Sequence, residues 1–229
     1  MHKTTFSTLL AASTLLTVSA ISTQAEAVDG LSANVSVANS YIWRGISQSD
    51  GEAAVSGGLD YAADSGFYVG TWTSNVDFGD ETNYELDFYM GFGGELGNGF
   101  TYGAGYIYYA YPDAGYNGID ADYDFSEVFG SLGYGAFSVT AYFGVHNGDD
   151  AKWNDGAMYL SGDAEFEVAD GLALSLHLGS YTYDDSSADY LDYSVTLSKS
   201  NFSFGLVATD IDGNDDIKAL ISYTVDIDL

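Results

Sequence analysis

The feature that most constrains this chain is a two-residue alternation between apolar side chains and polar or small ones. In one segment, the alternating rows are Tyr84, Leu86, Phe88, Met90 and Phe92 on one side and Glu85, Asp87, Tyr89 and Gly91 on the other. Because successive side chains of a β-strand point to opposite faces, each such segment has one apolar and one polar face. No long segment has the 3.6-residue period of an amphipathic helix. The pattern predicts an all-β fold.

About twelve such segments follow one another, and most have the length of about 9 to 11 residues with which a tilted strand crosses a bilayer. They begin near Ser32, Ala53, Phe67, Tyr84, Phe100, Asp124, Ala136, Ala157, Leu172, Asp189, Phe202 and Asp216. Their number and length predict an antiparallel transmembrane β-barrel. A soluble, secreted all-β protein, which can also alternate apolar and polar residues, is the alternative.

The connectors between these segments alternate between tight turns and long loops. The tight turns are 63–66, 94–99, 134–135, 169–171 and 199–201, and the long loops are 45–52, 74–83, 110–123, 144–156, 181–188 and 209–215. Short periplasmic turns and long extracellular loops are typical of outer-membrane barrels. An even strand count then places both ends of the barrel on the periplasmic side.

The first 27 residues have the pattern of a secretory signal peptide. A basic start at Lys3 precedes an apolar stretch over residues 6–21, and Ala25-Glu26-Ala27 matches a cleavage site. A retained membrane anchor is the alternative. We expect residues 1–27 to be a cleaved signal peptide and residues 28–229 to form one barrel domain in the outer membrane of a Gram-negative bacterium. Its expected partners there are outer-membrane lipid and the outer-membrane assembly machinery.

The composition excludes several classes of function. The chain has 34 acidic residues against 5 lysines and arginines, and it has no cysteine. The acidic excess argues against binding to nucleic acid, and the lack of cysteine excludes disulfides, thiol catalysis and Cys-ligated metals. The acidic segment 210–216 does not have EF-hand spacing, since the twelfth position from Asp210 is Ile221. A solvated hairpin loop is therefore the better interpretation of this segment than a calcium site, and we predict no metal and no cofactor.

The charged residues of the predicted strands sort by face. Seven acids lie on the face opposite the apolar row. The face of Glu127 is ambiguous, because Phe125 and Phe129 share it. Two bases also fall on the inner face. A charge that faces the middle of a bilayer costs up to about 2–4 kcal/mol, so we expect these residues to face the lumen. The predicted pore-lining residues are Arg44, Asp60, Glu85, Asp87, Glu127, Asp163, Glu165, Glu167, Asp192 and Lys218.

An acidic lumen favours cations, because acidic side chains around a pore attract them. The sequence therefore predicts a porin-like channel for passive diffusion of small cationic or neutral solutes, with a preference for cations. The alternative is a structural or adhesive barrel whose lumen is blocked by a loop or by packed side chains, with the acids as solvated wall residues.

An outer-membrane lipid-modifying enzyme is a third, weaker alternative. Ser175 and His177 share a face only because of the strand alternation, and no nucleophile-elbow pattern occurs. We therefore predict no enzymatic activity. The rows of tyrosine and tryptophan are expected to be lipid-facing and interfacial residues first.

The segment 39–51 (NSYIWRGISQSDG) resembles the opening signature of the TorF-type porin family of proteobacteria, also known as the Gcw conserved-hypothetical family. The resemblance continues through residues 57–61, 65–70, 72 and 74–77, with mild departures at Ala53 and Thr71. It implies an outer-membrane barrel of the porin kind and leaves the solute undefined. The residues that carry it are Tyr41, Arg44, Gly45, Ser47, Gln48, Asp50, Gly51, Gly57, Gly58, Gly66, Gly70, Trp72 and Asn75.

Arg44 is the one base within this signature. We expect it at the end of the first strand, facing inward, with Asp50-Gly51 as a turn before the second strand. We hypothesise that Arg44 pairs with a lumen carboxylate such as Asp60 or Glu85 and pins the first loop at the pore mouth. A structural ion pair without influence on permeation is the alternative.

Overall fold

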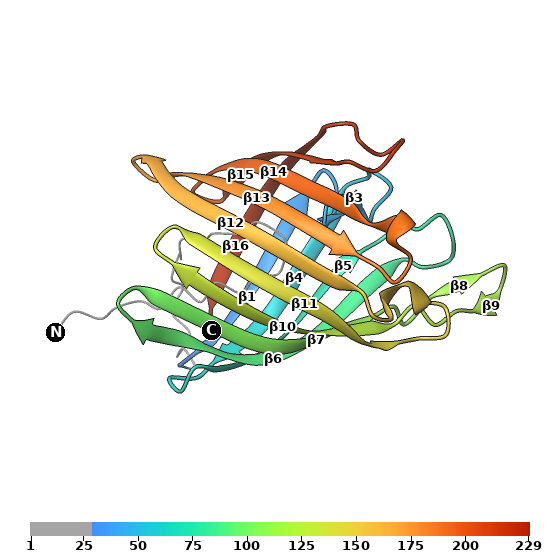
Figure 1. Ribbon diagram of the computed structural model, residues 1–229, viewed down its shortest axis with the longest axis horizontal. Helices are drawn as coiled ribbons and strands as arrows, with labels where there is room; N and C mark the ends of the chain where they lie inside the picture. Colours follow the sequence, from blue (N-terminus) through green and yellow to red (C-terminus); the bar gives the residue numbers. More distant parts are fainter. Residues whose placement is uncertain (1–28) are drawn as a thin grey trace.

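The computed structural model describes residues 29–229, so the predicted signal peptide lies outside the described residues. Twelve antiparallel strands form a closed barrel, and β1 pairs with β16 to close it (Figure 1). The barrel strands are β1 (Leu31–Ala38), β4 (Ala54–Ala62), β5 (Phe67–Asn75), β6 (Tyr84–Gly97), β7 (Phe100–Ala110), β10 (Phe125–Tyr134), β11 (Phe137–Asn147), β12 (Met158–Ala169), β13 (Leu172–Thr182), β14 (Tyr190–Lys199), β15 (Phe202–Thr209) and β16 (Lys218–Asp228). The predicted all-β barrel is confirmed, and each predicted strand start lies within two residues of the observed one.

In the structure, the apolar row of a strand is exposed and the polar row is buried, the reverse of the arrangement in a soluble protein. On β6, Phe88, Met90 and Phe92 are each at least half exposed, whereas Glu85 and Asp87 of the alternate row are buried. Strand β14 alternates strictly between buried and exposed residues in the same way. An apolar outside and a polar inside are what a barrel surrounded by lipid requires.

No helix within residues 29–229 is long and apolar enough to cross a membrane.

The two ends of the barrel differ. All tight turns lie at one end, together with the start of β1 and the end of β16, which pair at Ser32 and Asp228. The long loops lie at the other end, on the right in Figure 1. These loops contain two short hairpins and two 3₁₀ turns, namely β2 (Ile42–Trp43) with β3 (Ile46–Ser47), β8 (Gly115–Tyr116) with β9 (Ile119–Asp120), η1 (Lys152–Asn154) and η2 (Ser186–Ala188).

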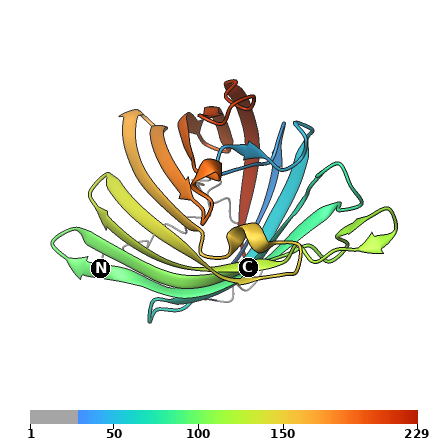
Figure 2. The same ribbon diagram turned by 45° about the vertical axis from the view of Figure 1, so that its right-hand side comes forward.

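The first loop differs from its prediction. Strand β1 ends at Ala38, so the loop covers residues 39–53 rather than beginning at Gly45. Its β2–β3 hairpin lies inside the mouth of the barrel, where Figure 2 shows it in blue between the orange-red and the cyan walls. Arg44 is therefore at the tip of this hairpin and not at the end of the first strand.

Tyrosines occupy part of the interior of the barrel. Nine tyrosines of the described chain are buried, and several of them join the clusters that fill the long-loop half. Other tyrosines, such as Tyr61, Tyr102 and Tyr134, lie on the outer surface as predicted. The expectation that tyrosines serve mainly as lipid-facing residues is wrong for the buried set. A tyrosine ring can fill a polar lumen because its hydroxyl bonds to the acids there.

Candidate functional site

The site is a constriction built around the tip of the β2–β3 hairpin. Ile42 pairs with Ser47 and Trp43 with Ile46, which leaves Arg44 and Gly45 as a two-residue turn. Both have positive φ angles, 47° and 81°, the conformation that a tight hairpin of this type requires. A Cβ atom on Gly45 would lie 2.5 Å from Thr209 Cγ2, so only glycine allows the turn to approach β15 this closely.

Arg44 forms a buried ion pair with Glu127 on β10. Its two terminal nitrogens donate to the two carboxylate oxygens at 2.8 and 2.6 Å, and both side chains are 1% exposed. Burial alone would lower the pKa of Arg44, but the Glu127 carboxylate, together with the nearby Tyr181 and Tyr109, outweighs this effect and raises it. The predicted pairing with Asp60 or Glu85 is wrong, because the hairpin carries the guanidinium away from β1 toward the opposite wall. The ambiguous Glu127 faces the interior.

Four aromatic rings surround the same guanidinium. The Arg44 Cζ atom lies 4.3 Å from the Trp43 ring centroid, 4.9 Å from Tyr142, 4.1 Å from Tyr159 and 4.8 Å from Tyr181. These distances fall within the range of cation–π attraction, which is strongest where water is excluded. We call this arrangement of Glu127 and the four rings the guanidinium cage.

The hairpin loop also contacts the other walls. The Tyr41 hydroxyl donates to Glu85 on β6 at 2.8 Å, and its ring packs at 5.2 Å against Trp72 of β5. The Tyr190 hydroxyl of β14 donates to the Arg44 carbonyl at 3.1 Å. The first loop thus bonds to strands on opposite sides of the barrel and crosses the lumen between them.

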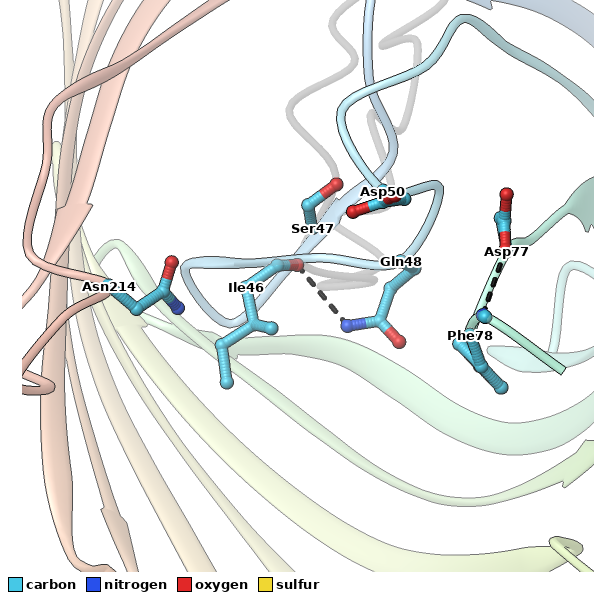
Figure 3. Close-up of a pocket in the computed structure, with 8 residues that line it drawn as sticks. Ile46, Ser47, Gln48, Asp50, Asp77, Phe78 and Asn214 are labelled. Atoms are coloured by element: carbon cyan, nitrogen blue, oxygen red, sulfur yellow. Dashed lines mark hydrogen bonds between the residues drawn. The ribbon is translucent and has the colours of Figure 1, made fainter.

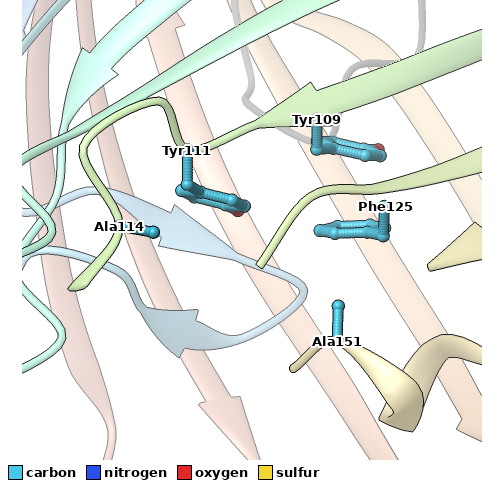
Figure 4. Close-up of a cluster of buried hydrophobic side chains, with 5 residues drawn as sticks. All are labelled: Tyr109, Tyr111, Ala114, Phe125 and Ala151. Carbon is cyan, nitrogen blue, oxygen red and sulfur yellow. The ribbon is translucent and has the colours of Figure 1, made fainter. Parts of the chain in front are cut away.

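Glu85 and Asp87, both predicted to line the pore, are buried beside this crossing. The hydroxyls of Tyr41 and Tyr111 each donate to Glu85 at 2.8 Å. Burial, and then the nearby Glu85 carboxylate, raises the pKa of both tyrosines, so they remain donors at any physiological pH. Tyr111 belongs with Tyr109 and Phe125 to an aromatic cluster, and the Tyr109 and Phe125 rings stack at 4.3 Å (Figure 4).

A second polar cluster lies on β12–β14. His177 Nδ1 lies 2.6 Å from Asp163, and its Nε2 lies 2.9 Å from Asp192. The Tyr159 hydroxyl lies 3.0 Å from Asp192. Asp163 and Asp192 are among the predicted pore-lining residues, and His177 is not, although its strand parity places it with them. Ser175 bonds to Glu165 instead of His177, so the cluster lacks the arrangement of a hydrolase.

The remaining predicted lumen residues lie away from the constriction. Glu165 and Glu167 are exposed on the inner face of β12 near the short-turn end, and Asp60 accepts a bond from Tyr89. Lys218, at the long-loop end of β16, donates to the Asn214 carbonyl. The sequence prediction omitted Asp226, which alternates with the outward Val225 and faces inward near Asp60.

The signature residues mostly build the first loop. Ser47 accepts a bond from the backbone of Gly51, and Asp50 and Gly51 turn the chain with positive φ angles. Asn75 fixes the end of the loop through the backbone of Val55. Ser47, Gln48 and Asp50 line a cavity of about 480 Å³ above the hairpin, together with Ile46, Asp77, Phe78, Gly79 and Asn214 (Figure 3).

The chain belongs to a bacterial family of unknown function designated Gcw_chp, whose family model matches residues 22–226. No curated protein matches the sequence. Among solved structures, the fold is similar to the KdgM porin, with a TM-score of 0.55 and 8% identity over 85% of this chain and 97% of that chain. The KdgM porin in complex with disordered oligogalacturonate gives a TM-score of 0.51 and 7% identity over 86% and 95%. This likeness concerns the fold.

Proposed function

We propose that this protein is a porin-like channel of the Gram-negative outer membrane that prefers cations. The observation that carries the proposal is the distribution of charge within a closed barrel. Acids face the interior on both sides of the constriction, while Arg44 is neutralised by Glu127. Cations are attracted into such a lumen from either end.

The constriction sets the expected size of the solute. The first loop crosses the lumen, and Arg44, Glu127 and Tyr181 are almost completely buried there. We therefore expect small, low-conductance channels rather than wide pores. An acidic lumen repels a chain of carboxylates, so we do not expect this protein to conduct the oligogalacturonate with which the KdgM porin was solved.

The proposal includes the narrower assignment to the TorF-type porins, a cleaved signal peptide over residues 1–27 and no enzymatic activity. The apolar outer surface supports a location in lipid, with the assembly machinery as the partner that inserts the barrel. No nucleic acid, metal or cofactor forms part of the proposed function.

A closed structural or adhesive barrel is the second candidate, and the buried crossing of the first loop favours it. In this case the long loops, rather than the lumen, carry the function. The two candidates share one fold, and ion flow past the guanidinium cage distinguishes them.

Conductance of the purified protein in a planar bilayer under a salt gradient tests the proposal. We expect channels whose reversal potential has the sign of a cation-selective pore. Folded, heat-modifiable protein that gives no channels would support the closed barrel. An anion-selective reversal potential would contradict the proposed preference outright.

A further inference from the structure

A second cavity, of about 360 Å³, lies in the mouth of the barrel beside the hairpin. Six aromatic rings line it, from four different segments of the chain: Trp43, Phe78, Tyr111, Tyr123, Phe125 and Trp153. The rings are in mutual contact, since Phe125 lies 4.9 Å from Trp153 and Phe78 lies 5.5 Å from Tyr111. Phe78 and Trp153 are about 40% exposed, so the aromatic cavity is accessible from outside.

Two carboxylates complete the aromatic cavity, and none of its lining residues within 29–229 is basic. Asp80 accepts bonds from the Thr82 backbone at 2.8 Å and from the Tyr123 hydroxyl at 2.9 Å. Slight burial acts to raise the pKa of Asp80, but these hydrogen bonds outweigh it and lower the pKa, so the group is ionised at neutral pH. Asp150 accepts a bond from the Asp122 backbone. A carboxylate has about four acceptor sites, so both acids retain capacity for a ligand.

A cavity lined by aromatic rings and carboxylates, with no basic side chain among them, suits an organic cation. The negative faces of aromatic rings attract a positive charge, and alkyl groups on that charge bury apolar surface against them. The guanidinium cage shows that this chain already binds such a group, because Arg44 is held there by four rings and one carboxylate. Trp43 is common to the guanidinium cage and the aromatic cavity, so the two lie side by side.

We propose that the aromatic cavity binds small organic cations bearing an ammonium or guanidinium group. Asp80 and Asp150 supply the counter-charge, and Trp43 and Trp153 supply the rings. The inference deepens the proposed function by naming the solute class, and its role in uptake rests on that function. The binding itself does not require that the channel conducts.

Calorimetric titration of the detergent-refolded protein with choline chloride tests this inference. We expect saturable binding of choline, and binding at least about tenfold weaker for its neutral isostere 3,3-dimethyl-1-butanol. Asp80→Asn and Trp153→Leu should each weaken choline binding about tenfold. The matched control is Asp212→Asn, an exposed carboxylate of a different loop, which should bind choline like the unmodified protein.

Equal binding of the neutral isostere would overturn the assignment to cations, and so would an absence of choline and guanidinium binding. Titration with guanidinium chloride at millimolar concentration distinguishes the two cation types, and binding of either one supports the site. Conductance is measured on the same preparations. Choline binding without conductance would retain the aromatic cavity and reject the channel, whereas conductance without binding would do the reverse.

Discussion

At the scale of single residues, the most consequential contact is the pair of Arg44 and Glu127. Both charges are out of water, and two hydrogen bonds join them. A buried ion pair adds little net stability compared with apolar residues, but removal of one partner leaves an uncompensated charge. The pair therefore fixes the position of the hairpin more than it stabilises the barrel.

The first prediction concerns Arg44→Met. We expect the free energy of unfolding in urea to fall by about 3–5 kcal/mol, because Glu127 is left buried without its partner. Channel conductance should rise, because the guanidinium no longer occupies the cage. The double variant R44M/E127Q should recover part of the lost stability. Unchanged stability and unchanged conductance in Arg44→Met would contradict both the pinning of the first loop and a structural ion pair.

The second prediction uses a matched pair of glycines. A Cβ atom at Gly179 would overlap the Tyr159 hydroxyl and Asp192, whereas at Gly162 it would meet no atom within 4 Å. We expect Gly179→Ala to lower stability by about 1–3 kcal/mol through overpacking. Gly162→Ala should change it by less than about 0.5 kcal/mol. The temperature at which each variant loses its folded mobility on gels compares their stabilities. An equal fall in this temperature for both variants would contradict the close packing of Tyr159.

At the scale of elements, the first loop is unlike the other loops. Its hairpin folds into the lumen, where the side chains of Tyr41 and Arg44 bond to β6 and β10 and the Arg44 carbonyl accepts a bond from β14. The barrel strands do not need the hairpin for their ladder, since β1 pairs directly with β4 over its whole length. The hairpin is therefore an insert that narrows the lumen without carrying the sheet.

The third prediction is that the barrel tolerates loss of the hairpin. Replacement of residues 41–48 by a short Gly-Ser linker should leave a folded, heat-modifiable barrel with a several-fold larger single-channel conductance. Replacement of residues 115–120, the β8–β9 hairpin, is the matched control and should change conductance little. A shortened first loop with unchanged conductance would show that the lumen is closed elsewhere.

At the scale of the whole molecule, the acidic residues are not distributed evenly over the surface. The acids of the strands lie on the inner face, and the apolar row of each strand faces outward. Toward the short-turn end, Glu165 and Glu167 are exposed on β12, and neither takes part in an ion pair within residues 29–229. Such charges act on mobile ions through their long-range field.

The fourth prediction concerns selectivity. Glu165→Gln combined with Glu167→Gln should move the reversal potential toward zero at about 0.1 M salt and much less at about 1 M, where the screening length falls to about 3 Å. Asp170→Asn, an exposed acid in the adjacent turn, is the control. If the double variant kept its full cation selectivity at low salt, Glu165 and Glu167 would not contribute to that selectivity.

Much of the fold could be predicted from the sequence. The two-residue period is local, so it encodes the strands, their boundaries and the lipid-facing side without knowledge of the partners. The same parity placed Glu85, Asp87, Asp163 and Asp192 inside. It also placed Tyr89 in the row opposite the apolar side chains of β6, but the residue type did not indicate burial, because tyrosine is equally suited to a membrane interface.

By itself, then, the sequence determined a closed barrel of about twelve strands with an apolar exterior and an acidic interior, because side-chain alternation depends only on the strand. Only the tertiary structure decided that the first loop folds inward and that Arg44 finds Glu127, 83 positions along the chain. The physical reason is that a hairpin tip can reach any wall of a barrel. Which wall it reaches depends on the curvature and closure of all twelve strands, together with the space that Gly45 leaves beside Thr209.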